Sequence, residues 1–207
     1  MKALATLLIC FLTLISCTIA ADTIFETQTI RDGQTIVSPQ QTFELGFFSP
    51  SNTTQNRYLG IWYKHLATGP VIWVANRDTP IGNKSGELTL NHGGLLVLRD
   101  STANRIIWSS ILSRKSENEV AKLLDNSNFI VFDSQNGPEN YIWQSFDEPS
   151  DTIMPDMKFG RNLKRGVVTN YTSWKSDNDP TRGKYMIYMD FNVLPQIFQK
   201  KRRCYSI

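Results

Sequence analysis

The residues with the most suggestive spacing for ligand chemistry lie in the segment LLDNSNFIVFD, residues 123–133. Four polar residues at 125–128 precede four apolar residues at 129–132. One interpretation is a turn that leads into a buried strand, because Asn tolerates left-handed backbone angles and hydrogen-bonds its own chain. The other is a ligand site on a strand, because alternate residues of a strand share one face.

The sequence contains few residues whose types and spacing suit catalysis or metal binding. His65 and His92 are the 2 histidines and lie 27 residues apart, with no Cys or acid at ligand spacing. Ser110 and Ser145 have no histidine or acidic partner that the sequence places nearby. The acids at 147–151 could hold a cation, but turn and connector roles explain them as well. We therefore expect no catalytic residue, no metal site and no cofactor.

The N-terminus has the pattern of a secretory signal peptide. Lys2 precedes a nearly uninterrupted apolar run at 3–15, and small residues follow in SCTIAAD. The apolar run is shorter than the ~18–20 residues of a membrane-spanning helix. We expect residues 1–21 to be a signal peptide, and the mature chain to be extracellular without a membrane span. A bacterial lipoprotein signal at Cys17 is the competing interpretation.

Cysteines and glycosylation motifs fit the same compartment. Cys10 and Cys17 lie in the signal segment, which leaves Cys204 without an internal disulfide partner. Three N-glycosylation triplets accompany the signal segment, and they begin at Asn52, Asn83 and Asn170.

The composition indicates one folded domain and part of another. The chain has 207 residues, of which 41% are hydrophobic and 11% aromatic, enough to fill a core. The net charge of +3 is too small to indicate a nucleic-acid partner.

Three tryptophans mark an internal repeat. VIW ends at Trp73, IIW at Trp108 and YIW at Trp143, which are 35 residues apart in both steps. Such a period is typical of repeated units that cannot bury their apolar faces alone. Short β-type runs separated by turn signals surround each tryptophan. The sequence predicts an all-β fold, with three small sheets around a core to which the three tryptophans contribute, closed like a prism or barrel.

The pattern changes near residue 146. We expect the repeat domain over 22–147, an extended connector over 148–165, and the start of an uncompleted second β domain over 166–207. β-type runs are predicted around 167–174 and 184–191. The tail QKKRRCYSI is expected to be neither a strand nor an ordinary domain end, and it suggests a truncated or alternatively spliced product. A C-terminal prenylation box at Cys204 is rejected, because a secreted chain does not meet cytosolic transferases.

Several motifs together resemble one family of plant proteins. DGQTIVSPQQTFELGFFSP, NRYLGIWYK, VIWVANRDTPI and IWQSFDEPSDTIMPDMKFG are similar to the extracellular start of plant S-domain (G-type lectin) receptor-like kinases and S-locus glycoproteins. The resemblance runs nearly continuously over residues 27–160. It implies a bulb-type, mannose-binding-lectin-like domain, a threefold β-prism, followed by an incomplete S-locus glycoprotein-type β segment. The kinase signatures of the family are missing, so this chain is expected not to be an enzyme.

The resemblance implies which residues of the segment 123–133 would contact a sugar. Mannose-binding bulb lectins carry the strand motif Q-x-D-x-N-x-V-x-Y, whose polar groups pair with sugar hydroxyls on one face. The matching positions here are Leu124, Asn126, Asn128, Ile130 and Phe132. Of these, Asn128 alone is identical, and the amide of the first position and the hydroxyl of the last are lost. The turn interpretation is therefore favoured over a working mannose site.

The other two motif copies are more degenerate. NHGGLLVLR supplies Asn91 at the first position and retains Val97 alone, and PQQTFELGF has no intact polar triad. Any residual sugar contact is expected at Asn126, Asn128, Ile130, Phe132, Asn91 and Val97.

The resemblance also implies a role. We expect a secreted, apoplastic recognition module for cell-surface recognition, such as pollen recognition or defence, without mannose binding of the usual kind. Its ligand would be a glycan, a peptide or a co-receptor, and the chain could pair as a homodimer or with a related receptor. The alternative is the N-terminal fragment of an active membrane Ser/Thr receptor-like kinase.

Overall fold

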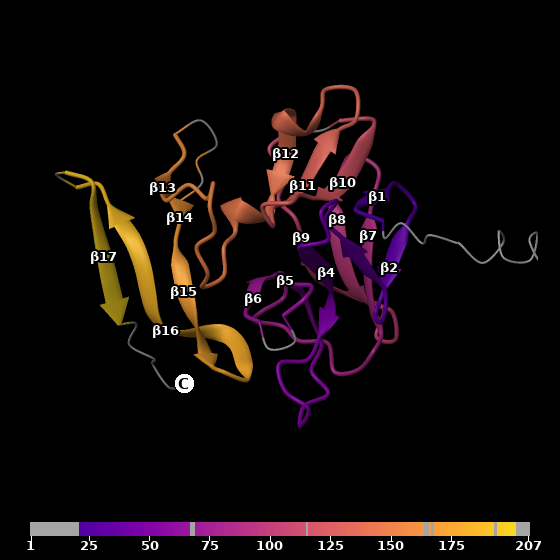
Figure 1. The fold of residues 1–207 in the computed structure, drawn as a ribbon, viewed down its shortest axis with the longest axis horizontal. Helices are drawn as coiled ribbons and strands as arrows, with labels where there is room; N and C mark the ends of the chain where they lie inside the picture. Colours follow the sequence, from indigo (N-terminus) through magenta and orange to yellow (C-terminus); the bar gives the residue numbers. More distant parts are fainter. Residues whose placement is uncertain are drawn as a thin grey trace, which may run out of the picture.

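The computed structural model describes residues 21–66, 69–114, 116–163, 166, 168–192 and 194–201. The expected signal peptide and Cys204 lie outside these residues, apart from Ala21. Three four-stranded antiparallel sheets form the first part of the fold (Figure 1). The first sheet has the order β3 (Thr35–Val37), β4 (Phe43–Phe48), β5 (Tyr58–Tyr63) and β6 (Val71–Val74). The second has the order β2 (Thr29–Arg31), β7 (Gly86–Leu90), β8 (Leu96–Asp100) and β9 (Arg105–Ser109). The third has the order β1 (Thr23–Phe25), β10 (Glu119–Leu123), β11 (Phe129–Asp133) and β12 (Tyr141–Gln144).

The three sheets repeat the same design. Each ends in a strand that carries one of the repeated tryptophans, Trp73 on β6, Trp108 on β9 and Trp143 on β12. In each sheet, the pairing of this last strand with its neighbour contains one register shift. Bulges of this kind bend and twist a strand, which helps small sheets to close around a shared core.

The tryptophans meet at the centre, as the 35-residue period predicts. Their ring centroids are 5.9 Å apart for Trp73 and Trp108, 6.0 Å for Trp73 and Trp143, and 5.8 Å for Trp108 and Trp143. All three pairs are edge-to-face, the arrangement that the charge distribution of aromatic rings favours. The predicted all-β fold is confirmed, and three sheets around one core make it a threefold β-prism.

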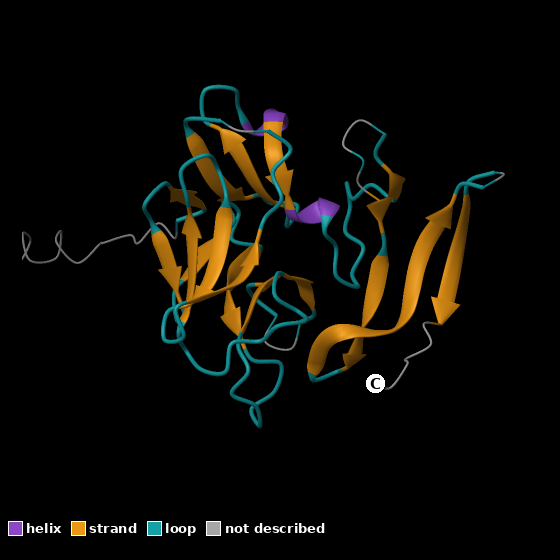
Figure 2. Cartoon of the chain, turned by 180° about the vertical axis from the view of Figure 1, so that it is seen from behind, coloured by secondary structure: helices purple, strands orange, loops and turns teal. Residues whose placement is uncertain are grey.

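The chain continues into a second group of strands beside the prism (Figure 1). A two-stranded pair contains β13 (Gly160–Arg161) and β14 (Val168–Thr169), and a three-stranded sheet contains β15 (Tyr171–Ser176), β16 (Asp179–Asp190) and β17 (Gln196–Lys201). Two short 3₁₀ helices, η1 (Pro138–Asn140) and η2 (Ser145–Asp147), flank β12 (Figure 2). Within the described residues, no helix is long and apolar enough to cross a membrane.

Strand β17 corrects one prediction. Lys200 and Lys201 belong to the tail that was expected not to form a strand, yet they pair with Met186 and Tyr185 of β16. Main-chain pairing with β16 extends the strand into the basic run, and exposed lysines are common on edge strands because they discourage further pairing. The rest of the tail, residues 202–207, lies outside the described residues.

Candidate functional site

The segment at 125–128 forms a turn between β10 and β11. Ser127 N donates to Leu124 O at 3.1 Å, and Leu124 N donates to Asn128 O at 2.9 Å. Asn126 Oδ1 accepts from Asn128 N at 3.1 Å, so an Asn side chain bonds its own chain as predicted. The prediction that Asn takes the left-handed backbone angle is wrong, because Ser127 has the positive φ of 72°.

The motif's one identical residue has both its amide nitrogen and its amide oxygen hydrogen-bonded within the protein. Asn128 is 6% exposed, and its Nδ2 donates to Gln144 Oε1 at 2.9 Å. Its Oδ1 accepts from Ser145 Oγ at 3.2 Å and from Phe146 N at 3.4 Å. Asn126 Nδ2 donates to Asp156 Oδ2 at 3.2 Å. These contacts fix the turn against β12, η2 and the connector, and they use the groups that a sugar hydroxyl would need.

The structure does bring most of the predicted motif together. Asn126, Asn128 and Ile130 line a cavity of about 230 Å³. Phe132 packs with Ile130 in a small apolar cluster separate from the central core. Three positions of the motif therefore line one cavity, although Asn126 and Asn128 lie in the turn before β11, and the polar groups of both residues are already hydrogen-bonded within the protein.

The second predicted copy lies elsewhere, on the β7–β8 hairpin. Asn91 is exposed in the hairpin turn, and its Oδ1 accepts from Thr89 Oγ1 at 3.4 Å. Val97 is 6% exposed on β8. The structure thus does not join Asn91 and Val97 to the cavity at Asn128.

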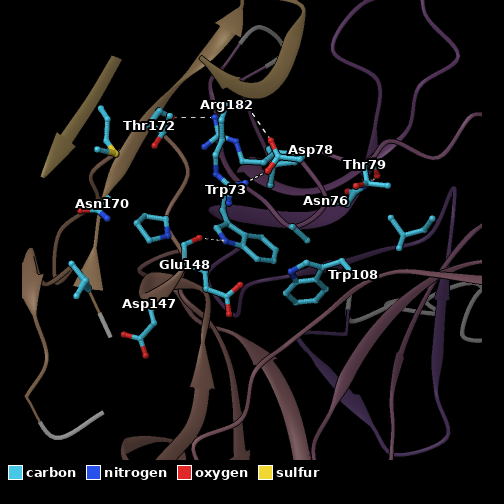
Figure 3. Close-up of a pocket in the computed structure, with 17 residues that line it drawn as sticks. Trp73, Asn76, Asp78, Thr79, Trp108, Asp147, Glu148, Asn170, Thr172 and Arg182 are labelled. Carbon is cyan, nitrogen blue, oxygen red and sulfur yellow. Dashed lines mark hydrogen bonds and ion pairs between the residues drawn. The ribbon is translucent and has the colours of Figure 1, made fainter. Parts of the chain in front are cut away.

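A larger cavity of about 490 Å³ lies between the prism and the strands that follow it (Figure 3). Trp73 and Trp108 form part of its wall, and Asp147, Asn170 and Arg182 contribute polar groups. Asn170 Oδ1 is buried without a hydrogen-bond partner among the described residues. Residue spacing does not predict this cavity, because its walls come from segments about 100 residues apart in the chain.

Glu148 closes one end of the tryptophan cluster. Its main-chain oxygen accepts from Trp73 Nε1 at 2.9 Å (Figure 3), and its Oε1 accepts from Trp143 Nε1 at 2.9 Å. Trp108 lies with Glu148 in the wall of the larger cavity. Burial raises the pKa of Glu148, and the neighbouring Asp147 adds to this, while the indole hydrogen bonds oppose it. A single residue of the connector thus accepts hydrogen bonds from the tryptophans of two repeats.

The raised pKa of Glu148 predicts how stability depends on pH. The folded state binds this proton more tightly than the unfolded state, so the free energy of unfolding falls as pH rises from the ordinary pKa of 4.5 to the raised value. Glu148→Gln keeps an amide oxygen for the indoles and does not ionise. Urea denaturation at several pH values gives the free energy of unfolding of both proteins. The value of the variant relative to the wild type should increase across that interval and stay constant above it. A constant difference at all pH values would contradict the assignment.

Arg77 joins the prism to the second sheet. It is 5% exposed, and its guanidinium donates to the main-chain oxygens of Pro180 at 2.8 Å, Thr172 at 3.1 Å and Ser173 at 3.0 Å. Burial lowers the pKa of Arg77 to about 10, with a smaller contribution from the nearby charge of Arg182. Arg77 forms no ion pair with Asp78 or Asp100, whose partners are different residues.

Asp78 and Asp100 have partners other than Arg77. Asp78 pairs with Arg182 across the same junction. Asp100 accepts from Ser85 Oγ at 2.6 Å, and this bond is the main reason for its lowered pKa.

The three glycosylation candidates lie in different surroundings. Asn52 and Asn83 are exposed on loops of the prism. Asn83 Oδ1 accepts from Ser85 N at 3.0 Å, which leaves its Nδ2 for a glycan. Asn170 is half-buried and lines the larger cavity. Modification of Asn170 therefore requires that the cavity be open when the sugar is attached.

Comparisons with known proteins identify the family and the relatives that the chain resembles. Residues 70–175, just over half of it, match the sequence profile of the family described as D-mannose binding lectin. The S-locus-specific glycoprotein S6 of Brassica oleracea is 40% identical over 201 residues, 94% of this chain and 45% of that protein. The G-type lectin S-receptor-like serine/threonine-protein kinase SRK of Arabidopsis thaliana is 43% identical over 175 residues, 84% of this chain and 20% of the kinase. The chain thus spans less than half the length of either relative.

Among solved structures, a monomeric monocot mannose-binding lectin from Gastrodia elata matches with a TM-score of 0.45 and 17% identity, over 60% of this chain and 96% of that chain. The prism assignment depends on the three sheets and the tryptophan cluster of the chain itself. The chain belongs to the bulb-type, D-mannose-binding lectin family, among the S-locus glycoproteins and G-type lectin receptor-like kinases.

Proposed function

We propose that this chain is an extracellular recognition module that does not bind mannose at the strand of the lectin motif. The observation that carries the proposal is the state of Asn128, whose amide nitrogen and oxygen are both paired within the protein and whose side chain is buried. Leu124 and Phe132 add no polar group where the motif has Gln and Tyr. Discrimination between polyols depends on such groups, because an unmatched buried donor or acceptor is costly.

The proposed role follows from the family. S-locus glycoproteins and their kinase relatives share this module, and we assign the chain to cell-surface recognition in the apoplast, in pollen recognition or defence. The apolar run of the signal segment and the exposed triplets at Asn52 and Asn83 support secretion. The cavity beside Glu148 has the carboxylate and amide groups that a glycan or a polar peptide requires, which favours it as the ligand surface.

Calorimetric titration of the full chain with mannose and a mannose-rich oligosaccharide tests the proposal. We expect no heat of binding at millimolar sugar, with the Gastrodia elata lectin as the positive control. Heat that appears with the wild type and vanishes in Asn128→Ala would overturn it, because the strand would then bind sugar despite its internal hydrogen bonds. Unfolding curves of both proteins exclude loss of the fold as the cause.

A second candidate function is the ligand-binding end of a membrane receptor kinase. It is favoured by the kinase relative, of which this chain covers 20%. Transcripts that continue past Ile207 into an apolar span and a kinase signature would support it. A stop codon after Ile207 in every transcript would exclude it.

A further inference from the structure

Three side chains that are far apart in the sequence meet at one end of the prism. They are Glu26 in the β1–β2 loop, His92 in the β7–β8 turn and Glu119 at the start of β10. One ligand atom from each lies within 4.8 Å of the other two. The sequence predicts no metal site, because these residues are not spaced along the chain as metal ligands are. They are brought together by two sheets, one that contains β1 and β10 and one that contains β2, β7 and β8.

The two carboxylates face each other across a strand pair. Strand β1 pairs with β10 so that Phe25 lies opposite Val120. The next step in this register places Glu26 opposite Glu119. Like charges directly opposite on neighbouring strands repel, so this arrangement is destabilising unless a positive group lies between them.

Glu119 is the unusual member of the cluster. It is 4% exposed, and neither of its carboxylate oxygens has a hydrogen-bond partner among the described residues. Its strand neighbours Ala121 and Leu123 belong to the central core, so its side chain starts from the core face of β10. A buried carboxylate without a partner is costly, and a bound cation removes that cost.

The turn that carries His92 packs directly against Glu119. A Cβ added at Gly94 would lie 2.9 Å from Glu119 Cγ, and Gly94 has the left-handed φ of 84° that glycine tolerates. Hydrogen bonds from Asn91 N to Leu95 O at 2.9 Å and from Gly94 N to Asn91 O at 3.0 Å hold the turn. His92 is thus held beside the buried carboxylate by a defined hairpin turn.

The spacing suits a small divalent transition metal. His92 Nδ1 lies 3.3 Å from Glu26 Oε1. Two ligands of a tetrahedral zinc ion with bonds of ~2.0–2.1 Å are about 3.3 Å apart. Glu119 needs only a side-chain adjustment to complete three protein ligands, and water can supply the fourth. Imidazole favours zinc over calcium or magnesium, which prefer oxygen ligands alone.

We propose that Glu26, His92 and Glu119 bind a divalent transition-metal cation of the zinc class. The ion would join the β1–β10 pair to the β7–β8 turn, and so connect two of the three sheets of the prism. This assignment is independent of the proposed recognition function.

Zinc titration of the metal-free full chain tests the proposal. The chain should carry Cys204→Ser so that its thiol does not compete for zinc. Calorimetry should show one zinc ion per chain, and a thermal scan should show a higher melting temperature with zinc than with calcium or magnesium. His92→Ala should weaken binding by at least ~10–100-fold, the loss that even a supporting residue around a metal causes. Glu119→Gln, which keeps the shape and removes the charge, should have a similar effect.

The matched control is His65→Ala, because His65 is exposed but outside the cluster. It should keep the full affinity and the full thermal shift. Absence of zinc binding by the wild type would overturn the proposal. Equal binding by His92→Ala and the wild type would also overturn it, because the ion would then lie elsewhere. If Glu119→Gln does not fold, the exposed pair His92→Ala and Glu26→Gln gives the same answer.

Discussion

Replacement of Trp143 by alanine is expected to lower the free energy of unfolding by about 3–5 kcal/mol, the range for truncating a buried tryptophan. Trp143 is 1% exposed and contacts Trp73, Trp108 and Phe129 edge-to-face. The change opens a cavity on the axis where the three sheets meet, so all of them lose a packing partner. Urea unfolding followed by circular dichroism measures the loss.

Two controls separate packing from hydrogen bonding. Trp143→Phe keeps most of the ring but removes the donor to Glu148 Oε1, and it should cost about 1–3 kcal/mol. Trp62→Ala changes a tryptophan that is half-buried and outside the central core, so the loss should be smaller. If Trp62→Ala destabilised the chain as much as Trp143→Ala, the three tryptophans would not be the centre of the fold.

The tryptophan period shows what can be predicted from this sequence. The repeat at Trp73, Trp108 and Trp143 predicts equivalent positions in three like units, and equivalent positions meet on the axis of a closed threefold arrangement. Equivalent serines of two repeats also accept hydrogen bonds from a neighbouring strand. Leu96 N donates to Ser110 Oγ at 3.0 Å in one sheet, and Phe129 N donates to Ser145 Oγ at 2.9 Å in another. Ser110 and Ser145, which have no catalytic partner in the sequence, thus act as structural acceptors.

The lectin motif was predictable only in part. Asn126, Asn128 and Ile130 line one cavity, although the two asparagines lie in the turn before β11 and not on the strand itself. What the sequence could not show is that Asn128 is already bonded to Gln144, Ser145 and Phe146. Those partners come from β12 and η2, and the packing of that strand and turn determines whether the amide is free.

Contacts across long sequence separations were beyond prediction. Arg77 precedes Asp78 in the sequence, and pairing with an acid is the simplest role for an arginine. Its acceptors are instead main-chain oxygens of Thr172, Ser173 and Pro180, which have no signature in residue type. Glu148 likewise has the residue type of an ordinary connector acid, although it accepts hydrogen bonds from the indoles of Trp73 and Trp143.

Replacement of Arg77 by methionine is expected to loosen the second sheet while the prism stays folded. The variant keeps much of the apolar stem but leaves the oxygens of Thr172, Ser173 and Pro180 without their charged donor, at a cost of about 1.5–3 kcal/mol. That free energy corresponds to roughly 10- to 100-fold faster hydrogen exchange if the sheet opens as a unit. Exchange measured by mass spectrometry should rise in peptides from β15 and β16 and stay unchanged in peptides around Trp108.

The matched control is Arg31→Met. Arg31 pairs with Glu87 on the prism, and its side chain is 63% exposed, so its loss should cost at most about 1 kcal/mol because exposed ion pairs are weak. Arg77→Lys should resemble Arg77→Met, because one ammonium group cannot reproduce a planar donor shared by three oxygens. An equal rise in exchange across prism and sheet would contradict the expectation and make the two parts one cooperative unit. A rise confined to β15 and β16 would show that the guanidinium of Arg77 stabilises the second sheet separately from the prism.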